Sequence, residues 1–328
     1  MKLKVGIIGC GLIGFKRAEA IKNSNIILNC FDINIENAQR FAAKFNCSVS
    51  RSYMELLENE NLDVVIISTT HDKLAELTSA AIRMNKHVLV EKPGALNIQE
   101  ISLIIKEREK NRNIKVHVGY NHRYHPAIMR ALEIYQSGDI GEFMFLRARY
   151  GHGGRIGYEK EWRFSKEKSG GGELIDQGSH LLDLSLAFLG EASLDYASTP
   201  TYFWDTKLDD NAFVSLKNSK NQIAFLHASC TEWKNMFSLE IYCKFGKLDI
   251  SGLGGSYGTE KLTLHKMKPN MGIPESYSWE YPGNDISWQL EIEEFFNDIN
   301  NDSKITDNLN SSILVLKLIS EIYERSTN

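Results

Sequence analysis

The stretch KLKVGIIGCGLIG at residues 2–14 decides the fold of the first part of this chain. An apolar run of strand length leads into Gly9, Gly11 and Gly14, a GxGxxG pattern, and a helical pattern over Leu12–Lys22 follows. In such a strand–turn–helix the first glycine permits the tight turn, the second lets the backbone approach a pyrophosphate, and the third lets helix and strand pack closely. The amino end of the helix offers free N–H groups and a positive dipole end to phosphates. The stretch therefore predicts a dinucleotide-binding Rossmann domain.

The next strand ends in a carboxylate that favours one cofactor over another. Ile26–Phe31 is followed by Asp32, 18 residues after Gly14, where a carboxylate can accept hydrogen bonds from both adenine-ribose hydroxyls. Asp32 would repel a 2′-phosphate by about 4 kcal/mol at 4 Å with an effective dielectric near 20, and no Lys or Arg lies between Asp32 and Arg40. We therefore expect NAD rather than NADP. The alternative is a glycine turn that only packs, or that binds another nucleotide. The expected cofactor contacts are Gly9, Gly11, Leu12, Ile13, Gly14, Asp32, Thr69, Glu91 and Lys92.

The pattern of strands and helices changes near residue 120. Before it, apolar runs such as VGII, DVVIIS and HVLV alternate with helical segments, which is typical of a parallel sheet covered on both faces. After it, strand patterns such as Asp195–Trp204 follow one another, and the main helices expected are Tyr124–Ser137, Glu173–Leu189, Ile286–Asn300 and Asp307–Arg325, with an Asn-rich connection over 300–310. We predict an α/β protein with a doubly wound parallel Rossmann sheet in residues 1–120, and a C-terminal α/β domain with a mainly antiparallel open sheet in residues 121–328.

Composition excludes several classes of protein. The net charge of −4 gives no reason to expect nucleic acid or an anionic membrane as partner, and no apolar run approaches the roughly 18 residues that span a bilayer. The first strand leaves no room for a signal peptide. The five cysteines are odd in number and form no CxxC pair, and His122 and His125 have no carboxylate close in sequence, so no metal site is expected. We expect a cytoplasmic protein.

Two segments carry candidate catalytic groups. The first is His87-Val-Leu-Val-Glu91-Lys92-Pro93, where a lysine at the carboxyl end of a parallel strand can point into the ligand crevice and donate a hydrogen bond to a substrate oxygen. The alternative is a surface lysine paired with Glu91.

The second segment is GGGELIDQGSHLLD at residues 170–183. The triple glycine suggests a flexible loop, and Asp176 and His180, four apart, share one helical face with Asp183. No Lys or Arg occurs from Ser169 to Thr206, which indicates a sheltered helix. Gly178 within it is best explained by something that approaches closely. Asp176 would orient the imidazole of His180 for general base catalysis. The alternative is a buried pair whose members satisfy each other.

These motifs, in this order and spacing, resemble the Gfo/Idh/MocA oxidoreductases, the glucose–fructose oxidoreductase and inositol dehydrogenase family. The resemblance covers essentially the whole chain. It implies an N-terminal NAD(P)-binding domain and a C-terminal substrate domain whose open sheet face often forms an oligomer interface, so a homodimer or homotetramer is expected. It also implies that Lys92 contacts the reacting hydroxyl, that Asp176 and His180 form the catalytic pair, and that the Lys92–Pro93 bond is cis. The chain departs from the family at Thr69-Thr70-His71, where relatives often read Thr-Pro-Asn.

The resemblance implies oxidation of a secondary alcohol on a sugar or polyol, with His180 as the base. Tyr120, Asn121 and Arg123 match a family segment that lines the substrate pocket. The stretch Arg147–Lys168 has seven basic and three acidic residues, and arginines beside aromatic rings suit a phosphate or carboxylate. An anionic, nucleotide-linked sugar is therefore one hypothesis, and a solvated surface is its alternative. The further substrate contacts expected are Tyr150, Arg155, Trp162 and Arg163.

Two other functions stay open at this point. An NAD-dependent glycosidase would oxidise its substrate transiently, eliminate the leaving group and reduce the product again, with no accumulation of NADH. A non-catalytic regulator would use dinucleotide binding as a signal. The presence of Lys92, Asp176 and His180 together argues against the regulator, because a regulator has no need of them.

Overall fold

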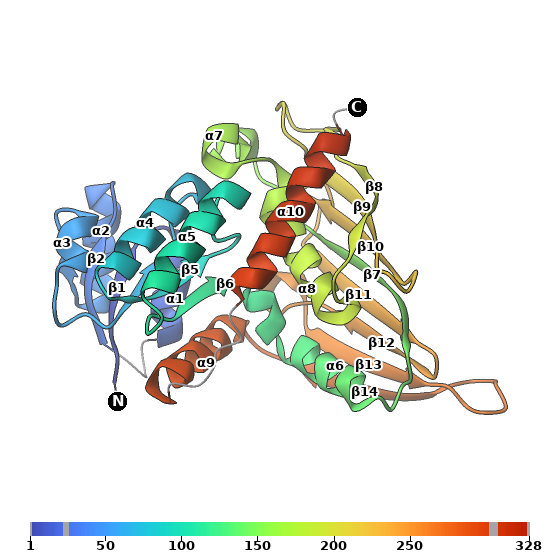
Figure 1. Cartoon of the computed structure of the whole chain (residues 1–328). Coiled ribbons are helices and arrows are strands. Elements are labelled where there is room, and N and C mark those ends of the chain that lie inside the picture. The colour runs from blue at the N-terminus through green and yellow to red at the C-terminus, as the bar shows by residue number, and fades with distance from the viewer. Residues whose placement is uncertain (1, 22–25, 302–307, 327–328) are drawn as a thin grey trace. The chain divides into compact units, whose positions relative to one another are not determined.

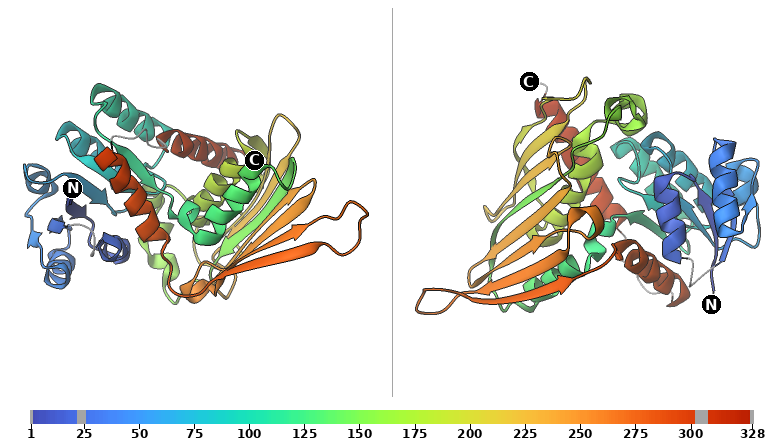
Figure 2. Two further views of the ribbon diagram at one scale, coloured as in Figure 1. Left: turned by 90° about the horizontal axis from the view of Figure 1, so that it is seen from below. Right: turned by 180° about the vertical axis from the view of Figure 1, so that it is seen from behind.

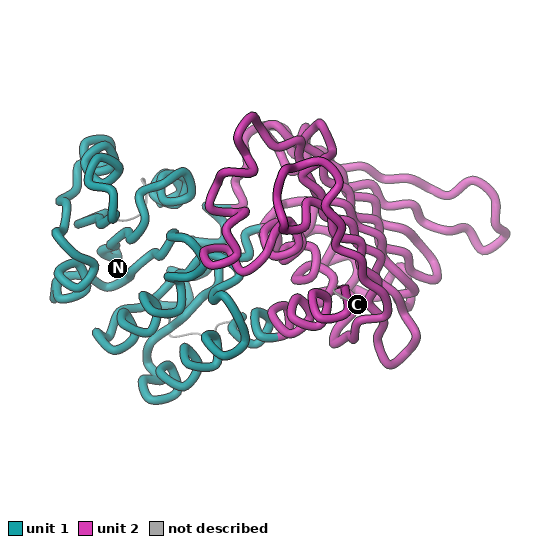
Figure 3. The backbone as a smooth tube through the Cα atoms, turned by 90° about the horizontal axis from the view of Figure 1, so that it is seen from above, with its two compact units in different colours: residues 1–121, 288–313 teal, residues 122–287, 314–328 magenta. Residues whose placement is uncertain are grey.

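The computed structural model describes residues 2–21, 26–301 and 308–326. The chain forms two compact units (Figure 3): unit 1 contains residues 1–121 and 288–313, and unit 2 contains residues 122–287 and 314–328. The expected boundary lies near residue 120, but the second unit does not take all residues from 121 onward, because residues 288–313 return to unit 1. Most of the Asn-rich connection expected over 300–310 lies outside the described residues. Among the helices described, none combines the length and the hydropathy needed to span a bilayer.

Unit 1 is built on a parallel sheet with the strand order β3-β2-β1-β4-β5-β6. This is the Rossmann order. Successive strands are added on one side of β1 up to β3 and on its other side from β4 onward, and ligands bind at the carboxyl ends of the strands near this switch point. The predicted doubly wound sheet is therefore confirmed. Its elements (Figure 1) are β1 (Lys4–Ile8), α1 (Leu12–Ile21), β2 (Ile26–Phe31), α2 (Ile35–Phe45), β3 (Ser48–Val49), α3 (Tyr53–Leu57), β4 (Val64–Ile67), α4 (His71–Arg83), β5 (His87–Glu91), α5 (Ile98–Lys110) and β6 (Val116–Gly119).

The core of unit 1 explains why its strands read as continuous apolar runs. All four residues of β4 are buried, as expected for a strand covered on both faces. On one face, Phe41 of α2 packs with Ile292 and Phe295 of α9 (Ser287–Asn301) against strands β1, β2, β4 and β5. Each fully buried side chain of this size contributes about 1.5–3 kcal/mol. Helix α9 thus completes a layer that the first 120 residues leave unfinished.

Unit 2 is a mainly antiparallel sheet with the strand order β14-β13-β12-β11-β7-β10-β9-β8, in which only the described pair β7 and β10 is parallel. The predicted mainly antiparallel open sheet is confirmed. Its main elements are α6 (Pro126–Ser137), β7 (Phe143–Gly151), α7 (Lys166–Ser169), α8 (Ser179–Leu189), β8 (Ser193–Ser198), β9 (Asn211–Lys217), β10 (Ile223–Ser229), β11 (Met236–Cys243), β12 (Gly246–Ser251), β13 (Glu260–Lys266) and β14 (Glu275–Tyr281); α10 (Leu309–Ser326) closes the chain.

The two faces of this sheet differ. Helices α6 and α8 lie on one face (Figure 2). The opposite face is not covered by any described part of unit 2. Strand β11 alternates strictly between buried and half-buried residues, as a strand with one covered face should. The uncovered face carries apolar as well as charged side chains, including Phe225, which is 52% exposed, and a stacked pair of Phe145 and Tyr242.

One expected strand in unit 2 is too long, and one strand of the structure was not expected. The strand expected over Asp195–Trp204 ends at Ser198, because Pro200 cannot donate to a ladder and the N–H groups of Tyr202, Phe203 and Trp204 bond to the Asp210 carboxylate instead. Strand β14 is absent from the sequence prediction, since most of its residues are exposed and an exposed edge strand leaves little apolar alternation to detect.

Candidate functional site

The glycine turn of unit 1 has two glycines that pack and one that leaves space. Gly9 has φ +96°, and a Cβ there would lie 2.5 Å from the carbonyl oxygen of Ser68. A Cβ on Gly14 would lie 2.0 Å from the carbonyl oxygen of Gly9. A Cβ on Gly11 would meet no atom within 4 Å. Local packing therefore accounts for Gly9 and Gly14 but not for Gly11, as a turn that admits a ligand requires.

Asp32 is already held at this turn. Its Oδ2 accepts a hydrogen bond from the backbone N–H of Cys10 at 2.7 Å, and its Oδ1 accepts one from Asn34 at 2.8 Å. An ionised carboxylate has about four acceptor sites, so two donors from the protein leave capacity for ribose hydroxyls. Sequence reasoning missed Ser68, whose hydroxyl donates to the carbonyl of Gly9 at 2.8 Å and fixes the turn from β4. Thr69 follows Ser68 directly.

The residues of this turn fit a dinucleotide. The space over Gly11 lies at the amino end of α1, where N–H groups and the helix dipole favour a pyrophosphate. Asp32 is oriented for a ribose. Leu12 is 71% exposed and Ile33 is 97% exposed, so apolar surface is available next to the turn, and Ile13 is half-buried beside Leu12. These residues would hold NAD.

Glu91 is buried in unit 1 and paired with Arg17. Arg17 of α1, fully buried, donates from Nε to Oε1 of Glu91 at 2.6 Å and from Nη1 to Oε2 of Glu291 in α9 at 2.5 Å. His117 lies 3.3 Å from the other oxygen of Glu291. Burial opposes ionisation of Glu291, but Arg17 and His117 lower its pKa. The Glu91 carboxylate, expected to contact cofactor, is therefore engaged with Arg17.

Residues from the end of the chain support the segment around Lys92. Ser312 donates to the carbonyl of Pro93, and Asn308 forms a pair of hydrogen bonds with the backbone N–H and C=O of Val118, at 2.8 and 2.5 Å. The Lys92–Pro93 bond is cis, as the resemblance implied. Lys92 itself is half-buried just after the carboxyl end of β5.

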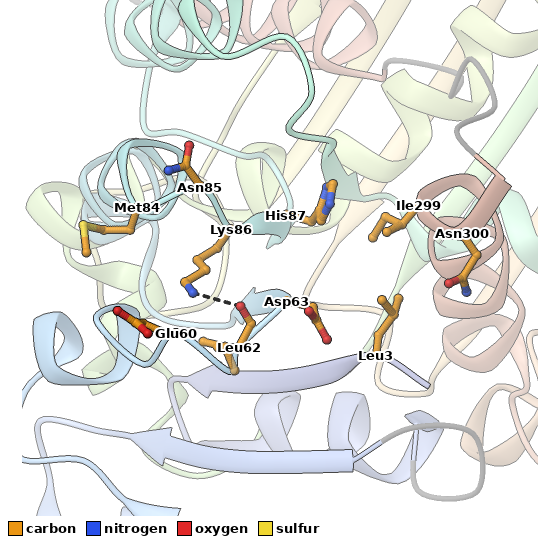
Figure 4. Close-up of a pocket in the computed structure, with 10 residues that line it drawn as sticks. All are labelled: Leu3, Glu60, Leu62, Asp63, Met84, Asn85, Lys86, His87, Ile299 and Asn300. Atoms are coloured by element: carbon orange, nitrogen blue, oxygen red, sulfur yellow. Dashed lines mark hydrogen bonds between the residues drawn. The ribbon is translucent and has the colours of Figure 1, made fainter. Parts of the chain in front are cut away.

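Unit 1 also has a hollow of about 810 Å³ (Figure 4), which is not the dinucleotide site. Leu3, Asp63 and His87 line it, and they stand at the amino ends of β1, β4 and β5. Lys86, also in its wall, donates to the carbonyls of Asn59 and Leu62 at 2.8 and 2.9 Å. The glycine turn follows the carboxyl end of β1, the edge where ligands of such sheets bind.

Two residues of the triple glycine in unit 2 pack tightly against protein, which accounts for glycine there without a flexible loop. A Cβ on Gly171 would lie 2.1 Å from the Tyr323 hydroxyl, and one on Gly172 would lie 2.1 Å from the carbonyl oxygen of Asp209. The Asp209 carboxylate accepts from the N–H groups of Gly172 and Leu174, at 3.0 and 2.7 Å, and from the Tyr323 hydroxyl at 2.8 Å. Asp209 and Tyr323 were missed, because neither lies near this segment in sequence.

The helix that carries the catalytic candidates begins with a π-helical turn, Leu174–Gly178, before α8. Such turns are frequent at functional sites. The helix is sheltered as expected, and Gly178 meets Ala228 of β10, 3.6 Å from where its Cβ would be. The close approach there is thus by protein. The Oδ2 of Asp176 accepts from Nε of Arg163 at 2.9 Å. Arg163, expected to bind substrate, is thereby paired with a catalytic candidate.

His180 lies in a cluster of rings within unit 2. Its imidazole stacks on that of His122, with ring centroids 3.8 Å apart and an angle of 28° between the planes. Tyr150 lies edge-on to both, at 4.8 Å from His122 and 6.0 Å from His180. Burial raises the pKa of Tyr150 well above its usual value, so its hydroxyl stays protonated. His122 was missed as a partner of His180, since they lie on separate elements. Among the described residues, no group of three or more His, Cys, Asp or Glu side chains could hold a metal ion.

The other substrate candidates are partly engaged in ion pairs. Arg123 forms a two-pronged pair with Asp183, both distances 2.7 Å. Arg155 pairs with Glu161 at 2.5 Å, and the same carboxylate lies 3.2 Å from Arg163. Trp162 stacks under the Arg163 guanidinium, 5.0 Å from the ring centroid. Tyr120 and Asn121 end the first segment of unit 1 and are buried.

Two family profiles match the chain. Residues 3–120 match the oxidoreductase family with an NAD-binding Rossmann fold, and residues 128–249 match the Gfo/Idh/MocA C-terminal domain. The chain belongs to the Gfo/Idh/MocA oxidoreductase family. Unit 1 of this family member therefore carries the NAD-binding Rossmann domain that its glycine turn predicted.

The chain is similar in sequence and in structure to several dehydrogenases. It is 29% identical over 156 residues to inositol 2-dehydrogenase of Salmonella typhimurium, a match that covers 46% of each chain, about half the length of that relative. It is 29% identical over 230 residues to levoglucosan dehydrogenase of Pseudarthrobacter phenanthrenivorans, 65% of this chain and 58% of that one. A solved structure of levoglucosan dehydrogenase in complex with NADH superposes with a TM-score of 0.89 at 20% identity, over 100% of this chain and 97% of that chain, which supports the fold.

Proposed function

We propose that this chain is an NAD-dependent dehydrogenase that oxidises a secondary hydroxyl of a sugar or polyol. The observation that carries the proposal is the glycine turn, where Gly11 faces open space while Asp32 is already oriented by two backbone N–H groups. The similar proteins named above, an inositol 2-dehydrogenase and a levoglucosan dehydrogenase, support the choice of substrate class.

In this proposal His180 is the general base. It takes the proton of the reacting hydroxyl, while the Asp176 carboxylate, held by Arg163 at 2.9 Å, supplies negative charge on the same helix. Lys92 donates a hydrogen bond to the substrate oxygen as negative charge develops there. NAD, when bound, supplies the acceptor for the hydride that leaves the carbon.

The contacts of the basic stretch favour an uncharged substrate over an anionic one. Arg155 and Arg163 are each paired with a carboxylate of unit 2, and Arg147 pairs with Glu240 of β11 at 2.9 Å. Guanidinium groups that are already paired have less to gain from a substrate phosphate. A nucleotide-linked sugar remains the second candidate, because the stretch has a net positive charge.

We also propose that the chain assembles as a homodimer or homotetramer through the uncovered face of the unit 2 sheet, in the cytoplasm. The exposed side chain of Phe225 on that face supports the assembly. The free thiols of all five cysteines support the cytoplasmic location. Light scattering after chromatography tests the assembly: Phe225→Asp should lower the mass of the particle. An unchanged mass for that variant, or a monomeric wild type, would contradict it.

The activity is tested by the absorbance of reduced nicotinamide with a panel of inositols, neutral sugars and nucleotide sugars. We expect NADH to accumulate with a neutral polyol or sugar. His180→Ala should lower kcat about a thousandfold, within the range for loss of a general base, while NAD binding, measured by calorimetry, stays intact. Near-normal rates in His180→Ala would overturn the assignment of the base. Turnover of a glycoside without NADH accumulation would favour the glycosidase instead, and NAD binding without any turnover would favour the regulator.

A double-mutant cycle tests whether Lys92 and His180 act on the same oxygen. Residues that act as one unit in catalysis give strongly non-additive losses. Lys92→Ala combined with His180→Ala should therefore cost little more than the worse single variant. Losses that multiply in full would show that the two side chains act independently.

A further inference from the structure

Three aromatic side chains gather on the loops at one end of the unit 2 sheet, and we call them the aromatic platform. Phe203 and Trp204 lie between β8 and β9, and Trp233 lies between β10 and β11. Phe203 stands edge-on to both indoles, with ring centroids 5.1 Å from Trp204 and 4.6 Å from Trp233. Phe203 is 58% exposed and Trp233 is 64% exposed. Single exposed apolar side chains need no explanation, but clusters of them mark binding surfaces.

The aromatic platform is held in place although it is exposed. The buried carboxylate of Asp210 accepts hydrogen bonds from the backbone N–H groups of Phe203 and Trp204, at 2.7 and 3.1 Å. The indole Nε1 of Trp204 donates to the carbonyl of Cys230 at 3.0 Å. A Cβ on Gly154 would lie 2.3 Å from the Trp204 ring, so glycine makes room for that indole. Aromatic side chains that are already fixed lose little conformational entropy when a ligand binds.

Trp233 adopts a backbone conformation that its side chain disfavours. Its φ is +55°, in the left-handed region that bulky residues rarely occupy and that costs about 1–3 kcal/mol. Glycine or asparagine would adopt this turn with less strain. A Cβ on Gly153 would lie 2.9 Å from the Cα of Trp233, so the neighbouring loop also accommodates this conformation. Because the local backbone gives no reason for a tryptophan, the exposed ring itself must be what the position requires.

The aromatic platform is continuous, within unit 2, with the helix that carries the catalytic candidates. Trp204 packs against Tyr158, with ring centroids 5.7 Å apart. Burial and the nearby negative charge of Asp176 raise the pKa of Tyr158, and Arg163, five residues further along the chain, bonds to Asp176 at 2.9 Å. One line of contacts thus joins the exposed rings to Asp176.

The chemistry of the aromatic platform suits a sugar ring. The face of an aromatic ring carries negative potential and attracts the C–H groups on the face of a pyranose. Carboxylates that can accept from sugar hydroxyls are adjacent in sequence, since Asp205 follows Trp204 and Glu232 precedes Trp233. Three arginines of the stretch Arg147–Lys168 are already paired with carboxylates of unit 2, which favours a neutral ring over a phosphate.

We propose that the aromatic platform binds a second sugar ring, joined by a glycosidic bond to the ring that is oxidised. The proposal rests on the proposed function, because it takes the reacting group to be a sugar hydroxyl. It narrows the substrate class from a single sugar or polyol to a neutral disaccharide or other glycoside. The second ring adds contact area at a distance from the reacting carbon, and such binding energy helps to position the reacting ring.

Fluorine NMR of protein labelled with 5-fluorotryptophan tests the proposal without turnover. The chain has five tryptophans, and single substitutions assign their signals. We expect the signals of Trp204 and Trp233 to shift on titration with cellobiose, maltose or lactose, while those of Trp279 on β14 and Trp288 on α9 stay unchanged. Signals of Trp204 and Trp233 that move with none of the three disaccharides, or that move only with uridine monophosphate, would overturn the proposal.

Kinetics with matched variants gives the second readout. Phe203→Ala removes a ring of the aromatic platform, and Phe245→Ala removes a ring of similar exposure, 59%, from the turn between β11 and β12. The ratio of kcat/KM for a disaccharide to that for its single ring should fall at least tenfold, about 1.4 kcal/mol, in Phe203→Ala and should be unchanged in Phe245→Ala. Equal ratios in wild type and Phe203→Ala would contradict the proposal. So would a lower particle mass of Phe203→Ala by light scattering, which would assign these rings to contacts between copies of the chain.

Trp233→Asn separates a binding role from a structural one. Asparagine tolerates the positive φ, so this variant should unfold at or above the wild-type temperature and still lose the preference for a disaccharide. A lower unfolding temperature with an unchanged ratio would show that the indole serves the fold alone. If no sugar or polyol yields NADH, the proposed function fails. If a single-ring sugar yields NADH but the signals of Trp204 and Trp233 ignore the disaccharides, only the present inference fails.

Discussion

The glycine turn of unit 1 and the triple glycine of unit 2 both lead into a helix, yet different atoms surround them. At Gly11 a Cβ would meet nothing within 4 Å, whereas at Gly171 and Gly172 it would meet Tyr323 and Asp209 at 2.1 Å. The same residue type thus leaves room for a ligand in one unit and for protein in the other. A glycine-rich segment before a helix marks a close approach, and the packing around it shows which partner approaches.

The largest effect expected from this comparison is on the stability of unit 2. Gly172→Ala places a methyl group against the backbone of Asp209, which cannot turn aside as a side chain can, and overpacking of this kind costs about 1–3 kcal/mol. We expect the upper end of that range, measured as a lower midpoint of thermal unfolding. Gly11→Ala is the matched control and should unfold at the wild-type temperature. Equal midpoints for wild type and Gly172→Ala would show that the loop can relax, which would contradict the tight packing of Gly172 against Asp209.

The second prediction compares the aspartate near each glycine segment, Asp32 in unit 1 and Asp209 in unit 2. We propose that Asp32 binds the cofactor, so Asp32→Ser should shift selectivity toward NADP by removing the charge that repels a 2′-phosphate. We expect the ratio of the dissociation constants for NADP and NAD to fall about 100-fold, or about 2.7 kcal/mol. Asp63→Asn removes the same charge at the amino end of β4 and should leave the ratio unchanged. Similar ratios in the wild type and in Asp32→Ser would separate Asp32 from the cofactor site.

Asp209 meets only protein, and its effect is a smaller one on the pH dependence of stability. Burial raises its pKa above the usual value, although the hydrogen bonds from Leu174 and Tyr323 oppose this. The folded state therefore holds this proton more tightly than the unfolded chain does. The contribution of protonated Asp209 to the free energy of unfolding is fully present below the pKa of this carboxyl in the unfolded chain. It is lost as the pH rises through the pKa in the folded state. We expect a smaller fall in the free energy of unfolding over that range for Asp209→Asn than for wild type, by denaturant titration. Identical slopes would mean that the pKa is not raised.

The sequence patterns predicted the parts of this molecule that depend on neighbouring residues. The glycine turn, Asp32 at the end of β2 and the alternation of strands and helices follow from local periodicity and turn chemistry. The long-range partners did not follow. Arg17 and Glu291 are 274 positions apart, and Tyr323 and Asp209 are 114 apart. Which distant carboxylate or hydroxyl reaches a buried group depends on how the elements pack, and no local pattern records it.

The same limit applied to the candidate catalytic helix. Asp176 and His180 were expected to pair because residues four apart share a helical face, and the structure adds a π-helical turn, Leu174–Gly178, directly before α8. The bond described for Asp176 is with Arg163, and the stack described for His180 is with His122. The residue types of the site were therefore predictable, while their partners required the fold.

Calorimetric titration of wild type and Gly11→Val with NAD tests the central claim most directly, namely that the space over Gly11 is where the cofactor's pyrophosphate approaches the backbone. We expect one NAD per chain in wild type and at least a tenfold weaker affinity, about 1.4 kcal/mol, in a variant that unfolds at the wild-type temperature. NAD binding of equal affinity in the two proteins would contradict the account.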